Sequence, residues 1–281
     1  MKRLFLKFAA VTVLGAVVSA CGGSDDDNNE PTRNIVQAAE SAGLTSLLAA
    51  ATKAELVTAL SASSTAGLTV FAPTNAAFNT LATQLGLADG PALVAALPKE
   101  ALASILSYHV LPARKSAANL SSGGATQATI YTFDGSAATV RVNTTGGVNI
   151  GDAVLTEAKV TSADVAATNG VVHVVDKVLV PPGVLNVVQM AQANPGAFSS
   201  LVGAVVSADL ATTLSGTGPF TVFAPTNTAF AAAPAGLTTE QLTTVLTYHV
   251  LGSQVLSTAI PFGTPVATVA GQDITINAGT A

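Results

Sequence analysis

Hydrophobic positions follow a helical period early in the chain and a strand period later. Segments with apolar side chains three or four residues apart are predicted helices; they are residues 35–51, 53–61 and 99–108. Apolar or alternating runs bounded by turn signals are predicted strands; they are residues 68–71, a segment beginning near 109, and residues 126–133, 138–143, 148–156 and 171–180. Because helices come first and most strands later, the pattern predicts an α+β fold rather than a βαβ design.

One segment of this pattern occurs twice. Residues 69–78, TVFAPTNAAF, recur as residues 221–230 with one change, and the YHVL of residues 108–111 recurs at 248–251. In each copy Pro73 or its counterpart stops a strand, and the following Thr is placed to cap a helix. The two motifs are further apart in the first copy, and its extra residues, around 85–98, are predicted to form a longer surface loop.

These motifs resemble those of the fasciclin family. Residues 69–78 resemble its first signature, Tyr108-His109 resembles its helix-to-strand element, and residues 163–176 are similar to its second signature. The resemblance covers roughly residue 33 to the end. It implies two tandem copies of an antiparallel β-wedge flanked by helices, and a role in extracellular adhesion and matrix contact.

The repeat assigns one complete and one incomplete domain. The first copy takes residues 33–182 and the second takes residues 183–281. Asn277 corresponds to Asn143, so the second copy lacks a counterpart of residues 148–182 and is C-terminally truncated. Missing strands leave open sheet edges. We expect the sequence to be a fragment of a longer protein; the alternative is a second domain completed by something else.

The N-terminus is typical of an exported lipoprotein. Residues 1–20 have a basic start and a short apolar run, as in a signal peptide. Residues 18–21, VSAC, match the bacterial lipobox, so Cys21 is the predicted lipid attachment site; the alternative is an ordinary signal peptide with a free cysteine nearby. Residues 21–32 are too polar to pack and predict a flexible tether. A lipidated Cys21 leaves no cysteine for a disulfide.

This leader predicts an envelope protein anchored to a membrane through its N-terminal lipid. Gly22 after the cysteine resembles the outer-membrane lipoproteins of Gram-negative bacteria. Charged residues make up only 10% of the chain and the net charge is −5, with no basic cluster. A protein that neutralises the phosphates of a nucleic acid needs clustered positive charge, so nucleic acid is not an expected partner. The expected partner is an extracellular protein or polysaccharide; the sequence does not specify the oligomeric state.

The three histidines are the candidates for chemistry. His109 and His249 occupy the same position in the two copies and are either general bases or metal ligands, or structural residues at the helix-to-strand junction. We favour the structural role, with a bond to a nearby loop such as the Thr74-Asn75 turn. Because HxxxH, HExxH, CxxC and GxSxG patterns do not occur, we expect no catalytic site, no metal and no cofactor.

His173 lies between two valines that face the other side of its strand, and we expect it to be half-buried or at a pocket rim. We favour a hydrogen-bonded core histidine over a functional one at this position. The structural motif residues of both copies are Thr74, Asn75, His173, Thr226, Asn227, Tyr248 and His249.

The resemblance also implies four candidate adhesion residues. By position they are Asp164, Val165, Tyr108 and His109. The alternative is that Val165 packs in the core and Asp164 caps a turn over residues 165–168. The leading hypothesis is therefore a non-enzymatic adhesion module. The alternatives are a module that binds a small apolar ligand between helices and wedge, and, last, a hydrolase.

Overall fold

The computed structural model describes residues 31–63, 65–234 and 236–279. The predicted signal peptide, Cys21 and nearly all of the predicted tether lie outside these residues. Within the described ranges, no helix has the length and apolar character needed to cross a membrane.

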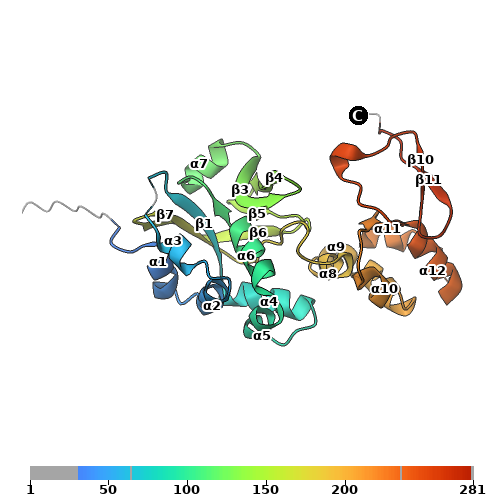
Figure 1. The fold of residues 1–281 in the computed structure, drawn as a ribbon, viewed down its shortest axis with the longest axis horizontal. Coiled ribbons are helices and arrows are strands. Elements are labelled where there is room, and N and C mark those ends of the chain that lie inside the picture. The colour runs from blue at the N-terminus through green and yellow to red at the C-terminus, as the bar shows by residue number, and fades with distance from the viewer. Residues whose placement is uncertain (1–30, 64, 235, 280–281) are drawn as a thin grey trace, which may run out of the picture. The chain divides into compact units, whose positions relative to one another are not determined.

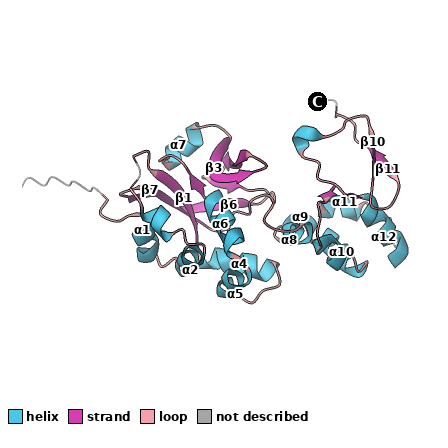
Figure 2. Ribbon diagram, viewed as in Figure 1, coloured by secondary structure: helices cyan, strands magenta, loops and turns pink. Residues whose placement is uncertain are grey.

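The first copy alternates helices with strands of one mixed sheet (Figures 1 and 2). Its helices are α1 (Ile35–Ser41), α2 (Thr45–Lys53), α3 (Val57–Ser61), α4 (Asn75–Gln84), α5 (Gly90–Ala96), α6 (Lys99–Tyr108) and α7 (Ala117–Ser122). Its strands are β1 (Leu68–Pro73), β2 (Val110–Leu111), β3 (Thr126–Phe133), β4 (Ser136–Asn143), β5 (Asn149–Gly151), β6 (Glu157–Ala167) and β7 (Gly170–Val175). The α+β class predicted from the pattern is confirmed.

The seven strands form one sheet in the order β2-β1-β7-β6-β5-β4-β3. Neighbouring strands are antiparallel except β1 and β7, which run parallel with Leu68 opposite Gly170. One hydrophobic core packs α1, α2, α4, α5 and α6 against β1 and β7. A second core, around Phe71 and Ile150, packs side chains of β1, β2, β4, β5, β6 and β7 together with α6 and α7. β1 therefore lies between two cores, which is why residues 69–73 are all buried and, apart from Thr69, apolar.

A local signal places the start of α4 correctly, and β1 runs two residues past its predicted end at residue 71. Pro73 is the last residue of β1, and the Thr74 hydroxyl accepts a hydrogen bond from the backbone N–H of Ala77 at 3.1 Å. This is the predicted N-cap. Helix α6 also has the predicted bounds.

Other predicted segments differ from the structure. The helix over residues 35–51 is two helices, because Gly43 takes a φ of +67° and turns the chain between α1 and α2. The strand predicted over 148–156 is only β5, and the long strand β6 that follows was not predicted. Its residues alternate poorly, since Ala, Ser and Thr face solvent over much of its length.

The extra residues of the first copy are not simply a surface loop. They include helix α5, whose Leu93 and Val94 are buried in the core. Asp89 caps this helix by accepting from Ala92 N–H at 2.8 Å, and a proline follows in its first turn. The loop prediction was wrong because a short segment with two buried side chains gives little periodic signal.

The second copy repeats the first half of this arrangement. Its elements are α8 (Val187–Gln192), α9 (Pro195–Ser207), α10 (Ala211–Ser215), β8 (Thr221–Val222), α11 (Asn227–Ala231), α12 (Thr239–Tyr248), β9 (Val250–Leu251), the 3-10 helix η1 (Ser257–Ala259), β10 (Pro265–Ala267) and β11 (Asp273–Thr275). Its strands form two separate antiparallel pairs, β8 with β9 and β10 with β11. A third core packs α8, α9, α10 and α12 together.

Candidate functional site

The Tyr-His pair lies inside the first copy. Tyr108 is the last residue of α6 and His109 is its C-cap, so the chain passes from helix to β2 at this pair. Each residue is only 1% exposed. The Tyr108 hydroxyl donates to the carbonyl oxygen of Thr139 in β4 at 2.9 Å, and burial raises the pKa of this hydroxyl. In the intact fold neither side chain presents a surface to a partner.

The His109 ring is held by two backbone groups. Its Nδ1 lies 2.7 Å from the carbonyl oxygen of Ile105, and its Nε2 accepts from the N–H of Leu179 at 2.9 Å. Because a backbone N–H can only donate, the proton of the neutral ring is on Nδ1. Burial lowers the pKa of His109 to about 4. The neutral ring therefore joins the end of α6 to the segment that follows β7.

The predicted bond between His109 and the Thr74-Asn75 turn is wrong. Asn75 instead closes the turn between α1 and α2: its Nδ2 donates to the Gly43 carbonyl, and its Oδ1 accepts from Ser46 N–H, both at 2.9 Å. In the second copy Thr226 caps α11 and Asn227 makes the corresponding bonds to the start of α9, at Pro195, Gly196 and Ser200. The turn is thus a repeated structural element.

His173 is fully buried in the sheet and hydrogen-bonded, as the predicted core histidine, and it is not half-buried or at a pocket rim. Its Nε2 lies 2.9 Å from the carbonyl oxygen of Lys115, and its Nδ1 accepts from the backbone N–H of Asp164 at 3.2 Å. The segment before α7 crosses this face of β7, which explains the burial. The acceptor role of Nδ1 places the proton of the neutral ring on Nε2.

Asp164 lies at a bulge of β6. The register with β7 shifts between Ser162 and Val165, and Asp164 takes a φ of +58°, a left-handed conformation that Asp tolerates better than most residues. Its Oδ1 accepts from the N–H of Ala117, the first residue of α7, at 2.9 Å. The expected cap of a turn at 165–168 is therefore wrong: these residues begin in β6, and the carboxylate holds the start of α7.

The structure separates the four candidate adhesion residues. Asp164 is exposed, and Val165 is half-buried against the core of the helical side. Tyr108 and His109 are buried around α6. Of the four, only Asp164 is exposed, and the buried ring of His173 accepts a hydrogen bond from its backbone N–H.

The second copy keeps the Tyr-His junction in a more open form. The Tyr248 hydroxyl donates to the Asp273 carbonyl at 3.2 Å, and His249 Nδ1 lies 2.7 Å from the Val245 carbonyl. Tyr248 and His249 are half-buried. The bond that Leu179 makes to His109 Nε2 in the first copy is not present at His249 Nε2 within the described ranges.

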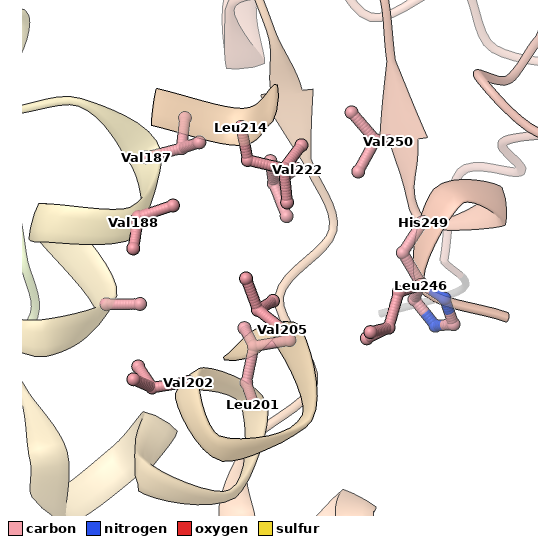
Figure 3. Close-up of a pocket in the computed structure, with 11 residues that line it drawn as sticks. Val187, Val188, Leu201, Val202, Val205, Leu214, Val222, Leu246, His249 and Val250 are labelled. Carbon is pink, nitrogen blue, oxygen red and sulfur yellow. The ribbon is translucent and has the colours of Figure 1, made fainter. Parts of the chain in front are cut away.

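Each copy encloses a small apolar cavity beside its histidine. Figure 3 shows the cavity of the second copy, where Val187 and Val188 of α8 face Val205 and Leu246. Corresponding residues of the first copy line its cavity. Each cavity has a volume of about 30 Å³, which is room for one or two water molecules and far below the several hundred Å³ of a typical ligand pocket.

Two buried polar residues of the first copy were not singled out from sequence. Asp152 accepts bonds from Val154, Thr156 and Val180, and burial raises its pKa. Asn169 accepts from Ile35 N–H at 3.0 Å and donates to the carbonyls of Leu60 and Ala62. Their partners lie far apart in the chain, apart from those in Asp152's own turn, so spacing alone gave no signal for them. In the described part of the chain, no group of three or more His, Cys, Asp or Glu could hold a metal ion.

The fasciclin domain family model matches residues 42–181 and 196–280, more than half of the chain, and the chain belongs to this family. The match in two segments agrees with the repeat.

Several relatives share this domain. Protein sll1483 of Synechocystis sp. is 43% identical over 99 residues, which are 32% of this chain and 54% of that protein. The chain thus spans about half the length of that relative. Human periostin is 26% identical over 237 residues, 83% of this chain and 26% of periostin. A solved FAS1 domain pair from the insect cell adhesion molecule Fasciclin I is 17% identical, with a TM-score of 0.43 and 86% of each chain covered.

Proposed function

We propose that this protein is a non-enzymatic interaction module of the cell envelope, exported and lipid-anchored at Cys21. Its first copy contacts an extracellular protein or polysaccharide through the surface around Asp164. Membership of the fasciclin family supports an adhesive role, since family members act mainly in extracellular adhesion. The lipobox at residues 18–21 supports the anchor.

The observation that carries the contact surface is the fixed geometry of Asp164. Its exposed carboxylate is held by Ala117 N–H, and its backbone N–H is held by the buried ring of His173. An interaction side chain that is already ordered loses less conformational entropy on binding. The bulge therefore presents a preorganised acidic group, whereas Tyr108 and His109 support the fold beneath.

The small size of the two cavities beside the histidines makes small-ligand binding there the less favoured alternative. The described histidine environments also favour a structural role over hydrolysis, because both ring nitrogens of His109 and of His173 bond to backbone groups.

Asp164→Asn tests the contact surface, because Asn accepts a left-handed backbone but lacks the charge. Beads coated with the purified full chain should bind envelope proteins or polysaccharide at least several-fold less with this variant. Asp134→Asn is the matched control: Asp134 is also exposed and left-handed, with a φ of +51°, but lies on the β3–β4 turn. Equal adhesion of Asp164→Asn and the parent chain, with the fold intact, would remove Asp164 from the contact surface.

Cys21→Ser tests the anchor. The parent chain should incorporate labelled fatty acid and sediment with membranes, since acyl chains bury many methylene groups in the bilayer. The Ser variant should lose the label and appear in the soluble fraction. Membrane association that persists in Cys21→Ser without label would show that another element holds the protein to the membrane.

A further inference from the structure

Strands β4 and β5 of the first copy (Figure 1) form one wall of a cavity that lies apart from the histidines. Its volume is about 380 Å³, against about 30 Å³ for each cavity beside a histidine. This is within the range of typical ligand sites, which measure from a few hundred to a thousand Å³. The residues of β4 that line it are mostly exposed, whereas Gly151 and Asp152 on the β5 side are buried, so the cavity is open along β4.

Arg141 of β4 is the cation of this cavity. Val140 beside it is buried in the second core, so Arg141 points to the opposite face of the strand, where it is exposed. Gly151 of β5 lies directly opposite Arg141, and a Cβ on Gly151 would be 3.4 Å from Nε and 3.6 Å from Nη2 of that arginine. The guanidinium therefore lies across β5, because glycine leaves room for it there.

The polar side chains of the cavity are free to bind a ligand. Within the described ranges, the side chains of Ser136, Thr139 and Arg141 make no hydrogen bond to another residue, and the ion pair found there joins Lys99 to Glu55 instead. A guanidinium that is packed against the sheet and has no carboxylate partner offers its planar set of N–H donors to an anion.

Two carboxylates near Arg141 are bonded elsewhere. Asp152 lines the cavity and accepts four hydrogen bonds from backbone and hydroxyl groups, which occupy both of its oxygens. Glu157 lies on the other side of Gly151 in the register and accepts from Asn143 Nδ2 at 3.2 Å. Their negative charge favours a ligand with a single charge, such as a carboxylate, over a phosphate monoester with a charge of about −1.5 to −2.

We propose that this cavity binds a hexuronic acid unit of an acidic polysaccharide. The guanidinium of Arg141 donates two parallel N–H bonds to the sugar carboxylate. The hydroxyls of Ser136 and Thr139 bind hydroxyls of the sugar, and Phe133 and Pro182 supply apolar surface for the C–H face of its ring. Because the cavity is open along β4, the sugar chain can continue on both sides of the bound unit.

A sugar fits this lining better than an acidic peptide does. β4 pairs with β3 and β5, and β5 pairs with β4 and β6, so the backbone here offers no free strand edge to a peptide. The groups left for recognition are hydroxyls, one guanidinium and two apolar rings, which match the hydroxyls, carboxylate and C–H faces of a hexuronate. The cavity shares no residue with the surface around Asp164, so it is a second contact site, beyond the function proposed above.

Titration of the isotope-labelled full chain with D-glucuronate, followed by nuclear magnetic resonance, tests the proposal. The Nε–H signal of Arg141 and the amide signal of Gly151 should shift and saturate, while the amide signal of Asp164 stays unchanged. D-Glucose has the same ring without the carboxylate and should bind roughly tenfold more weakly, because it gives the guanidinium no charged acceptor.

Three variants separate this site from general electrostatic attraction. Arg141→Gln should weaken glucuronate binding roughly tenfold, and Arg141→Lys should restore only part of it, because lysine keeps the charge but lacks the planar pair of donors. Lys159→Gln is the matched control, since Lys159 is an exposed cation on the neighbouring strand β6 and does not line the cavity. This control should leave binding nearly unchanged, and an equal loss in Arg141→Gln and Lys159→Gln would overturn the proposal.

The choice of ligand is tested in the same way. Equal binding of glucose and glucuronate, or no saturable shift at tens of millimolar glucuronate, would overturn the proposal. Tighter binding of glucose 6-phosphate than of glucuronate would assign the cavity to phosphate and overturn it too. So would tighter binding of an acidic peptide, acetylated triglutamate, than of trigalacturonate, because the partner would then be a protein.

Discussion

Single buried polar side chains connect distant parts of the first copy. His109 joins α6 to the segment after β7, and Asn169 joins the β6–β7 turn to α1 and to the end of α3. Each of these bonds satisfies a backbone group that the fold would otherwise leave unpaired in the interior. Loss of such a partner costs about 1–3 kcal/mol for each group left without a bond. These residues act as structural connectors.

The protonation of His109 should make the first copy sensitive to acid. Its pKa is lowered from 6.5 to about 4 by burial, so only the neutral ring fits the fold. Its contribution to stability is complete above about pH 6.5 and is lost as the pH falls towards 4, up to about 3 kcal/mol in total. Urea unfolding followed by tyrosine fluorescence between pH 7 and 4 measures this loss.

His109→Gln is the control for that prediction. The Gln side chain offers a donor and an acceptor but does not titrate in this range. The variant should be less stable at pH 7 and should show a shallower decline with acid. The same pH slope in both proteins would mean that other groups cause the acid sensitivity.

At the scale of elements, a single glycine can permit a strand pair or weaken a helix. β1 and β7 run side by side in parallel, and Gly170 at the start of β7 allows contact with the Leu68 carbonyl. By contrast, Gly203 lies exposed within α9, with open space where a Cβ would be. The two glycines therefore have opposite roles: one is needed for strand pairing, and the other weakens a helix.

Alanine substitutions should separate these two roles. Gly170→Ala should destabilise the first copy by about 1–3 kcal/mol, because β1 and β7 must move apart to admit the methyl group. Gly203→Ala should stabilise α9 by about 0.5–1 kcal/mol, because alanine loses less backbone entropy in a helix. Thermal or urea unfolding of the two variants measures both values. A neutral Gly170→Ala would show that the strands have room that the structure does not indicate.

At the scale of the molecule, the two copies share a sequence motif, and within the described residues their sheets differ in extent. β1 lies inside a seven-stranded sheet with a core on both faces, whereas β8 belongs to a two-stranded pair. Two-stranded pairs are marginally stable without further strands or packing. The helices of the second copy, packed around Leu201, Val205 and Leu246, supply most of its burial.

Backbone amides in β1 of the first copy should exchange more slowly than those in β8 of the second copy. Amides of Val70 and Ala72 should exchange at least roughly tenfold more slowly than those of Val222 and Ala224, because opening β1 requires breaking a central strand. Mass spectrometry of the full chain after timed exchange gives both rates in one sample. Equal rates would contradict the lower local stability expected of the β8–β9 pair.

The sequence by itself determined the features with local causes. Pro73 and Thr74 end a strand and start a helix through their own backbone chemistry, and the helical period of residues 99–108 matches α6. The repeat of residues 69–78 at 221–230 identified the two copies and the family. The strand end, the helix cap and the helical period each depend on residues a few positions apart, and the repeat needs only a comparison of two stretches of sequence, so none of these signals requires the tertiary structure.

The tertiary structure alone decided the features with distant causes. It placed β7 parallel to β1, gave His109 its bond to Leu179, buried His173 beneath the segment of Lys115, and turned the predicted loop at 85–98 into a packed helix. In each case the partner lies far away in the chain or contributes only one or two side chains. The hydrophobic period shows which side of a segment is buried, but the topology determines which other segments cover that side.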